Sequence, residues 1–151
     1  MTNKKLRDYM KLAYQMAEIA LEKGEVPIGA ILVWEGKVIA KNHNQKEGLF
    51  DPTAHAEILV IREAAQKLNN WRLKKAKLFV TAEPCVMCMG AIIQARIPVL
   101  VFGMNEFKFG GVESTADLRN HPMIPAEMQI YGGIMEKECQ ELMQTFFKNK
   151  R

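Results

Sequence analysis

Two cysteines and a histidine–glutamate pair are the residues of this chain whose types and spacing are best suited to chemistry. Cys85 and Cys88 form a C-x-x-C motif, and His55 lies upstream of them, two positions before Glu57. A C-x-x-C pair is compatible with a redox dithiol, with two metal thiolates or with two buried cysteines. The upstream histidine favours the metal, because His and Cys are typical zinc ligands. Three protein ligands leave one position for water, which is the arrangement of a catalytic zinc site.

Glu57 is the candidate for proton transfer at this site. Zinc lowers the pKa of a bound water to about 7, but attack by that water still needs a group that moves protons. Since one residue separates His55 from Glu57, the two side chains do not stack along one helix face, and Glu57 is not expected to be a fourth ligand. An isolated H-x-E is more often a packed His and a solvated Glu, so the prediction depends on the downstream cysteines.

Helices and strands that alternate along the chain must position these residues. The spacing of apolar residues predicts a helix over 6–21 that Gly24 ends. Two short strands over 28–34 and 37–42 are joined by Glu35-Gly36, which is the spacing of a tight hairpin. The pattern further predicts a polar loop at 43–51, a helix over 54–68 with Thr53 as its N-cap, a strand over 77–81, a helix from Pro84 to about 95, a strand over 98–103, a weaker strand over 128–131 and a helix over 136–147. This order predicts a three-layer α/β fold in a single domain over residues 1–151.

Composition limits the class of protein. Hydrophobic residues make up 48% and charged residues 25% of the 151 residues, as in an average globular protein. The apolar runs are far shorter than the roughly 20 residues that span a bilayer, and the N-terminus lacks the apolar segment of a secretory signal. We therefore expect a cytoplasmic protein that does not act at a membrane. The net charge of +4, with basic clusters at 72–77 and 148–151, is compatible with a polyanionic partner.

The segments T-A-H-A-E at 53–57 and T-A-E-P-C-V-M-C at 81–88 resemble those of the zinc-dependent cytidine and nucleobase deaminase superfamily. The resemblance implies a three-layer α-β-α fold with a central mixed sheet of about five strands and helices on both faces. It also implies one Zn²⁺ per subunit, held by His55, Cys85 and Cys88. The reaction would be hydrolytic deamination, in which zinc-bound hydroxide attacks the carbon that carries the amino group while Glu57 shuttles protons.

Within that superfamily the chain is similar, over nearly its whole length, to the bacterial tRNA-specific adenosine deaminases. The likeness includes G-E-V-P-I-G-A at 24–30, V-F-G at 101–103 and the Phe-Phe pair with the basic tail at 146–151. It implies conversion of the wobble adenosine to inosine, with attack at C6, in a tRNA anticodon stem-loop. It also implies a homodimer and no DNA substrate. The substrate-binding residues that it implies are Asn44, Val26, Ala56, Glu83, Glu106, Lys108 and Phe147.

Some positions depart from the pattern of that family. Glu106 stands where many members have Asp, the bulky residues Met104, Phe107 and Phe109 stand where many have small ones, and Pro125-Ala126-Glu127 replaces an Asn-His-Arg segment. These differences leave open a deaminase of a free nucleobase or nucleoside, of the guanine or cytosine type. A non-catalytic, zinc-stabilised RNA-binding module is the alternative from another class.

Several apolar residues have two interpretations in the sequence. Phe107 and Phe109 flank Lys108 and suit either stacking on a splayed RNA loop or core and dimer contacts. Phe146 and Phe147 have the same ambiguity. Met87, Met89 and Ile93 are expected either in a dimer interface or in the core, and Cys139 is expected to be buried. His43 and His121 are not expected to be metal ligands.

Overall fold

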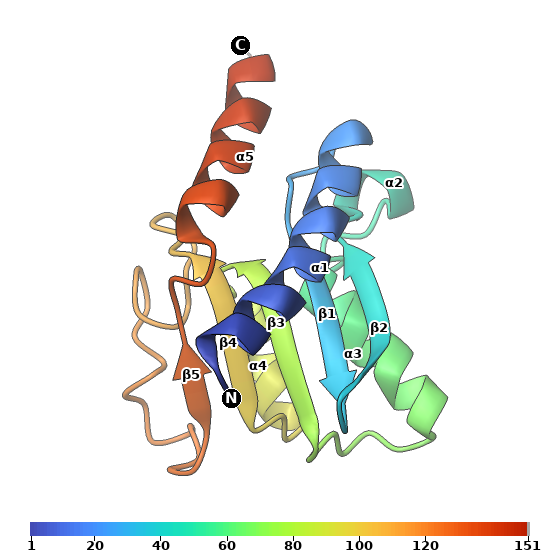
Figure 1. The fold of residues 1–151 in the computed structure, drawn as a ribbon, viewed down its shortest axis with the longest axis vertical. Helices are drawn as coiled ribbons and strands as arrows, with labels where there is room; N and C mark the ends of the chain where they lie inside the picture. Colours follow the sequence, from blue (N-terminus) through green and yellow to red (C-terminus); the bar gives the residue numbers. More distant parts are fainter. Residues whose placement is uncertain (151) are drawn as a thin grey trace.

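The computed structural model describes residues 1–150, in which five strands and five helices follow one another along the chain (Figure 1). In chain order they are α1 (Asn3–Glu22), β1 (Gly29–Trp34), β2 (Lys37–His43), α2 (Lys46–Leu49), α3 (Ala56–Leu68), β3 (Ala76–Ala82), α4 (Val86–Gln94), β4 (Val99–Met104), β5 (Gln129–Tyr131) and α5 (Glu136–Asn149).

The five strands form one mixed sheet in the order β2-β1-β3-β4-β5. β1 is antiparallel to both β2 and β3, whereas β3, β4 and β5 are parallel to one another. Parallel strands need a crossover, and α4 supplies the one between β3 and β4. The predicted α/β class and the mixed sheet of about five strands are confirmed.

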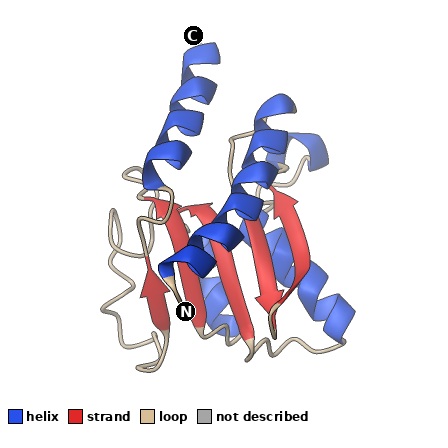
Figure 2. Ribbon diagram, in the orientation of Figure 1, coloured by secondary structure: helices blue, strands red, loops and turns tan. Residues whose placement is uncertain are grey.

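Helices cover both faces of this sheet (Figures 1 and 2). Because successive side chains of a strand point to opposite faces, each strand contributes to two cores. Ile31, Phe79 and Val101 pack with residues of α1 and α5 on one face. Leu78 and Phe102 pack with α3 and α4 on the other face. The sheet therefore holds the N-termini of α3 and α4 on the same side, which is where the candidate ligands lie.

Two glycines meet backbone requirements of this arrangement, a close approach at Gly29 and a positive φ at Gly36. Gly29 starts β1 directly beneath α1, where an added Cβ would lie 2.1 Å from the carbonyl oxygen of Ala13. Gly36 follows Glu35 in the hairpin turn, and φ is positive at both residues. Positive φ at both central residues is the requirement of a type I′ turn, so the predicted tight hairpin is confirmed.

Three local predictions are wrong: a local turn explains the first, and contacts between distant segments accompany the other two. Thr53 does not cap α3, because its backbone N–H and hydroxyl both donate to Asp51 Oδ1 in a turn, and the helix begins after His55. α4 begins at Val86 rather than Pro84, whose carbonyl accepts a hydrogen bond from the N–H of Gly111. The predicted loop at 43–51 contains α2, where backbone N–H groups donate to the Glu25 carboxylate.

None of the helices in residues 1–150 combines the length and the apolar character that crossing a membrane requires.

Candidate active site

His55 and Cys85 each occupy the residue immediately before a helix. His55 precedes α3 and Cys85 precedes α4, both with extended backbone angles. Glu57 and Cys88 then lie in the first turns of those helices. The free N–H groups and the helix dipole make a helix N-terminus electropositive, which favours thiolates and carboxylates there.

The three candidate ligand atoms converge on one point. His55 Nδ1 lies 3.6 Å from Cys85 Sγ and 3.4 Å from Cys88 Sγ. All three atoms lie within 4.8 Å of one another. Tetrahedral zinc with Zn–S of about 2.3 Å and Zn–N of about 2.0–2.1 Å would separate a sulfur and a nitrogen ligand by about 3.6 Å. The donor set and its spacing therefore fit a tetrahedral zinc with one open position.

The protonation of the two cysteines follows from their contact. The Cys88 thiol donates to Cys85 and His55 adds a further hydrogen bond, and together these outweigh desolvation and lower the pKa of Cys85 to about 4. The same contact with Cys85, together with burial, raises the pKa of Cys88. The hydrogen bond to Cys85 also raises the pKa of His55. Cys85 is thus a thiolate at neutral pH, which is the form that binds a metal.

Glu57 is almost completely buried beside these ligands, with 4% of its surface exposed. Burial disfavours the charged carboxylate and raises its pKa to about 7. Such a group both accepts and donates a proton near neutral pH.

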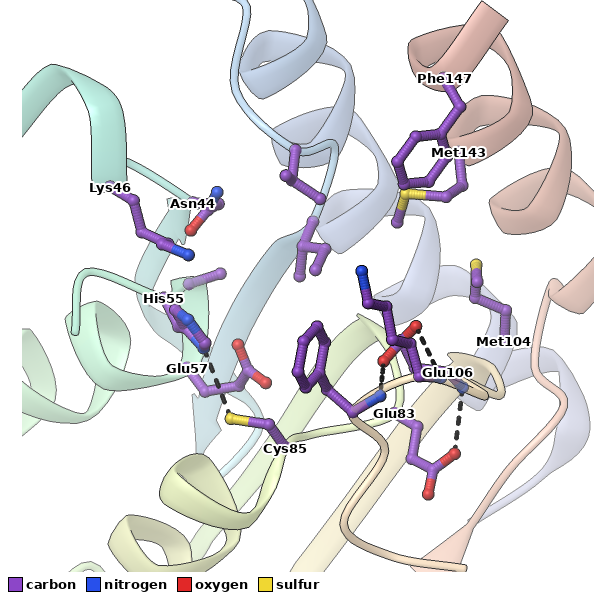
Figure 3. A pocket seen from close by; sticks show the side chains of 15 residues that line it. Asn44, Lys46, His55, Glu57, Glu83, Cys85, Met104, Glu106, Met143 and Phe147 are labelled. Carbon is purple, nitrogen blue, oxygen red and sulfur yellow. Dashed lines mark hydrogen bonds between the residues drawn. The ribbon is translucent and has the colours of Figure 1, made fainter. Parts of the chain in front are cut away.

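A pocket of about 250 Å³ opens over Glu57, His55 and Cys85 (Figure 3). Its volume is slightly below the range for small-molecule sites, roughly 300–1,000 Å³, and is of a size for a single base. Every residue for which the sequence predicts substrate binding lines it. These residues are Val26, Asn44, Ala56, Glu83, Glu106, Lys108 and Phe147.

One wall of the pocket follows the end of β2. Asn44 is buried there, and its backbone N–H donates to the carbonyl of Ile28. The ring of His43 is hydrogen-bonded through Nδ1 to the carbonyl of Asn44 at 2.9 Å. His121 Nδ1 accepts from the N–H of Met123 on the surface. Both histidines therefore lie outside the cluster of ligand atoms.

The loop after β4 forms the opposite wall. Glu106, Lys108 and Phe109 line the pocket, whereas Phe107 does not line it and is 78% exposed. The Lys108 ammonium lies 5.3 Å from the centre of the Phe109 ring. Neither phenylalanine belongs to the core. The structure thus separates two aromatic residues that the sequence treats alike.

Helix α5 closes the pocket from a third side (Figure 3). Met143 and Phe147 both line it, because residues four positions apart lie on the same helix face. Phe146 does not line the pocket and is buried. Lys46 and Ile28 also line the pocket.

Sequence reasoning missed Met143, Lys46 and Ile28. The i, i+4 spacing to Phe147 was a signal for Met143. The position of Lys46, two residues after Asn44, was a weaker one. Ile28 carried no signal beyond its place at the start of a strand.

Glu83 lines the pocket, but its carboxylate accepts hydrogen bonds from other residues of the protein. Burial alone would raise its pKa, and hydrogen bonds from Glu113, Ser114 and Glu106 outweigh burial and lower the pKa to about 2. Glu83 is therefore an anion whose oxygens face the loop after β4.

Fold and site together define a deaminase. The model of the MafB19-like deaminase family matches residues 4–151, and the chain belongs to that family. A tRNA-specific adenosine deaminase of Aquifex aeolicus is 43% identical over 143 residues, which cover 95% of this chain and 94% of the relative. The chain is a member of the tRNA-specific adenosine deaminases.

Solved structures agree with this assignment. A structure from a study of A-to-I editing by tRNA:A34 deaminases at the wobble position is 45% identical, with a TM-score of 0.85. The match covers 89% of this chain and 98% of that one. A guanine deaminase from Bacillus subtilis is 30% identical with a TM-score of 0.64, and the match covers 85% of this chain and 82% of that one.

Proposed function

We propose that this protein deaminates adenosine to inosine at the wobble position of a tRNA anticodon loop. The observation that carries the proposal is a buried Glu57 beside three convergent ligand atoms, at the floor of a pocket with Asn44 in its wall. Family membership supplies the substrate class, and the site supplies the chemistry.

His55, Cys85 and Cys88 would hold one zinc ion per subunit. Zinc bound there would supply Lewis-acid chemistry that makes water nucleophilic near neutral pH. The separations of the His55 nitrogen from the two sulfurs, 3.6 and 3.4 Å, support this assignment.

Glu57 moves protons in both halves of the reaction. Its carboxylate takes a proton from the attacking water and gives one to the amino nitrogen that leaves C6 as ammonia. Because water adds and ammonia departs at one face of the ring, a single buried carboxylate serves both steps. Exclusion of bulk water around Glu57 keeps that proton within the site.

The other pocket residues hold the base in register with Glu57. The Asn44 side chain offers both a donor and an acceptor, which suits the ring nitrogens of a flipped purine. Val26, Ile28 and Phe109 supply apolar walls against which the base packs.

Positive charge and an aromatic ring at the rim suit the remainder of an RNA loop. Lys46, Lys108 and Phe147 all line the pocket, and in Figure 3 Lys46 lies on the side opposite Phe147, which α5 carries. Unpaired bases stack on aromatic side chains, while lysines neutralise phosphates.

We further propose a cytoplasmic homodimer, with no activity on DNA. A reducing compartment keeps the two cysteines free for metal binding. The exposed apolar residues Val86 and Met87 in α4 support an interface there, whereas Met89 is fully buried and belongs to the core. Ile93 is half-buried on the same helix.

Inosine formation on a synthetic anticodon stem-loop with a wobble adenosine tests the proposed function. Zinc-loaded protein should form inosine, and the Glu57→Ala variant should not, with its zinc content unchanged. Glu63→Ala is the matched control, because Glu63 is a partly exposed residue of the same helix that pairs with Lys67. Retained activity in Glu57→Ala would contradict the assigned role.

Deamination of a free base is the second candidate function, because the similarity to the Bacillus subtilis guanine deaminase favours it. Free guanine and cytosine are therefore assayed beside the stem-loop. Ammonia release from a free base, with none from the RNA, would select this candidate.

A further inference from the structure

The carboxylate of Glu83 collects hydrogen bonds from one loop, the residues 105–114 that follow β4. The backbone N–H groups of Val112, Glu113 and Ser114 donate to its Oε2 at 3.0, 2.8 and 3.0 Å. The N–H of Glu106 and the side-chain amide of Asn105 donate to Oε1, each at 3.1 Å, and the Ser114 hydroxyl also donates to it. Three successive amides around one oxygen form a nest, which is an anion-binding arrangement of the backbone.

The shape of the loop depends on this contact. Gly110 passes so close to Glu83 that an added Cβ would lie 2.6 Å from its carboxyl carbon. A Cβ on Gly111 would lie 2.7 Å from the backbone nitrogen of Val86, and the N–H of Gly111 donates to the carbonyl of Pro84. The loop is thus built directly on the 83–86 segment that carries the metal ligand Cys85.

The same loop supplies one wall of the pocket. Glu106, Lys108 and Phe109 line it, and the N–H of Glu106 is itself one of the donors to Glu83. Figure 2 shows that the connection from β4 to β5 is irregular, and within 105–114 the strand-type pairing is one isolated bridge between Gly110 and Cys85. Charge-assisted hydrogen bonds to a buried carboxylate are roughly twice as strong as neutral ones.

From these contacts we infer that Glu83 is a positioning residue, which fixes the substrate-binding wall 105–114 relative to the metal-ligand segment. The sequence predicted that Glu83 binds the substrate. In this inference its carboxylate holds the loop and does not touch the substrate. The expectation that the position of this loop affects RNA binding rests on the proposed function.

Glu25 provides an internal comparison on the other side of the pocket. It is also buried, and its carboxylate accepts the N–H groups of Glu47 and Gly48 at 3.1 and 2.7 Å. These belong to α2, which carries Lys46 at the opposite rim. A glutamine at either position keeps the size of the side chain but replaces one acceptor oxygen with a donor.

Amide hydrogen exchange on the zinc-loaded 151-residue chain tests the role of Glu83 without RNA. Glu83→Gln should accelerate exchange at 106 and 112–114 by about tenfold or more, while amides 47 and 48 stay protected. Glu25→Gln should give the reverse pattern, and Glu127→Gln, an exposed glutamate in the same connection, should change neither. Faster exchange throughout the sheet, or unchanged exchange at 112–114, would overturn the inference.

Kinetics on the stem-loop add a second readout. Glu83→Gln should raise KM about tenfold with a smaller change in kcat and unchanged zinc content. If Glu83→Gln does not fold, Gly110→Ala disturbs the same contact with the carboxylate retained, and it should release the same amides. If the wild-type protein forms no inosine on the stem-loop, the proposed function fails. The exchange pattern still decides the role of Glu83.

Discussion

His55 and Cys85 come from two different helix starts, yet His55 Nδ1 and Cys85 Sγ lie 3.6 Å apart. Each residue is the last one before its helix, so the N-termini of α3 and α4 lie close together at the site. Both helices pack on the same face of the sheet, and this shared support sets the separation of the ligand atoms. The metal site is therefore a property of the sheet as much as of the C-x-x-C motif.

Removal of the metal should expose one reactive thiol. In the zinc-loaded protein we expect slow alkylation of all three cysteines. After chelation, Cys85 should react first, because its lowered pKa of about 4 makes it a thiolate. Cys139 should stay unreactive, because burial raises its pKa to about 12. Iodoacetamide labelling followed by mass spectrometry measures each site, and equally fast labelling of Cys85 with and without chelator would argue against a bound metal.

Asn44 should contribute to substrate recognition without holding the metal. Asn44→Ala removes a buried side chain that lines the pocket. Loss of one or two hydrogen bonds to the base should lower kcat/KM on the stem-loop by about 10- to 100-fold. Asn70→Ala, an exposed change before β3, is the control. Unchanged kcat/KM in Asn44→Ala, with zinc content intact, would remove the base-binding role.

Substitutions of Phe146 and Phe147 should have different effects, the first on the stability of the fold and the second on binding of the stem-loop. Their rings are 5.4 Å apart and nearly perpendicular, but Phe146 is 8% exposed and Phe147 is 55% exposed. Phe146→Ala should lower the free energy of unfolding by about 3 kcal/mol because it leaves a cavity in the core. Phe147→Ala should cost about 1 kcal/mol from the lost ring contact. Its larger effect should be a rise in KM for the stem-loop of about tenfold, since stacking with a base is lost.

Chemical denaturation and stem-loop kinetics on the two variants check this pair. A large loss of stability in Phe147→Ala, or a selective rise in KM in Phe146→Ala, would reverse the assignment of the two rings.

The exposed start of α4 should form the dimer interface. Met87→Asp places a charge on an apolar residue that is 38% exposed. An acidic residue in the first turn of a helix suits the dipole, so the fold should be kept while dimerisation is lost. Leu12→Asp is the matched control, because Leu12 is equally exposed on α1. Sedimentation measures both variants, and a wild type that is monomeric at all concentrations would rule out the interface.

The sequence predicted the parts of the fold that local patterns encode. Apolar periodicity indicated the helices and strands, and Glu35-Gly36 indicated the hairpin turn. The boundaries near the site were wrong at Thr53 and Pro84, because Asp51 and the N–H of Gly111 compete for groups that would otherwise begin the helices. Those competitors are tertiary or turn contacts, which helix-capping preferences do not include.

Residue type and spacing were enough to predict the chemistry of the site. A histidine, two cysteines and a glutamate in that order indicate a catalytic zinc site with a group that transfers protons. The family resemblance also indicated seven of the residues that line the pocket, whereas tertiary structure added Met143, Lys46 and Ile28 and decided what each side chain does there. The tertiary structure put Phe147 in the pocket and Phe146 in the core, and it turned the carboxylate of Glu83 toward the loop at 105–114. The physical reason is that burial and hydrogen-bond partners are set by segments far apart in the chain, and no local pattern records which of them will meet.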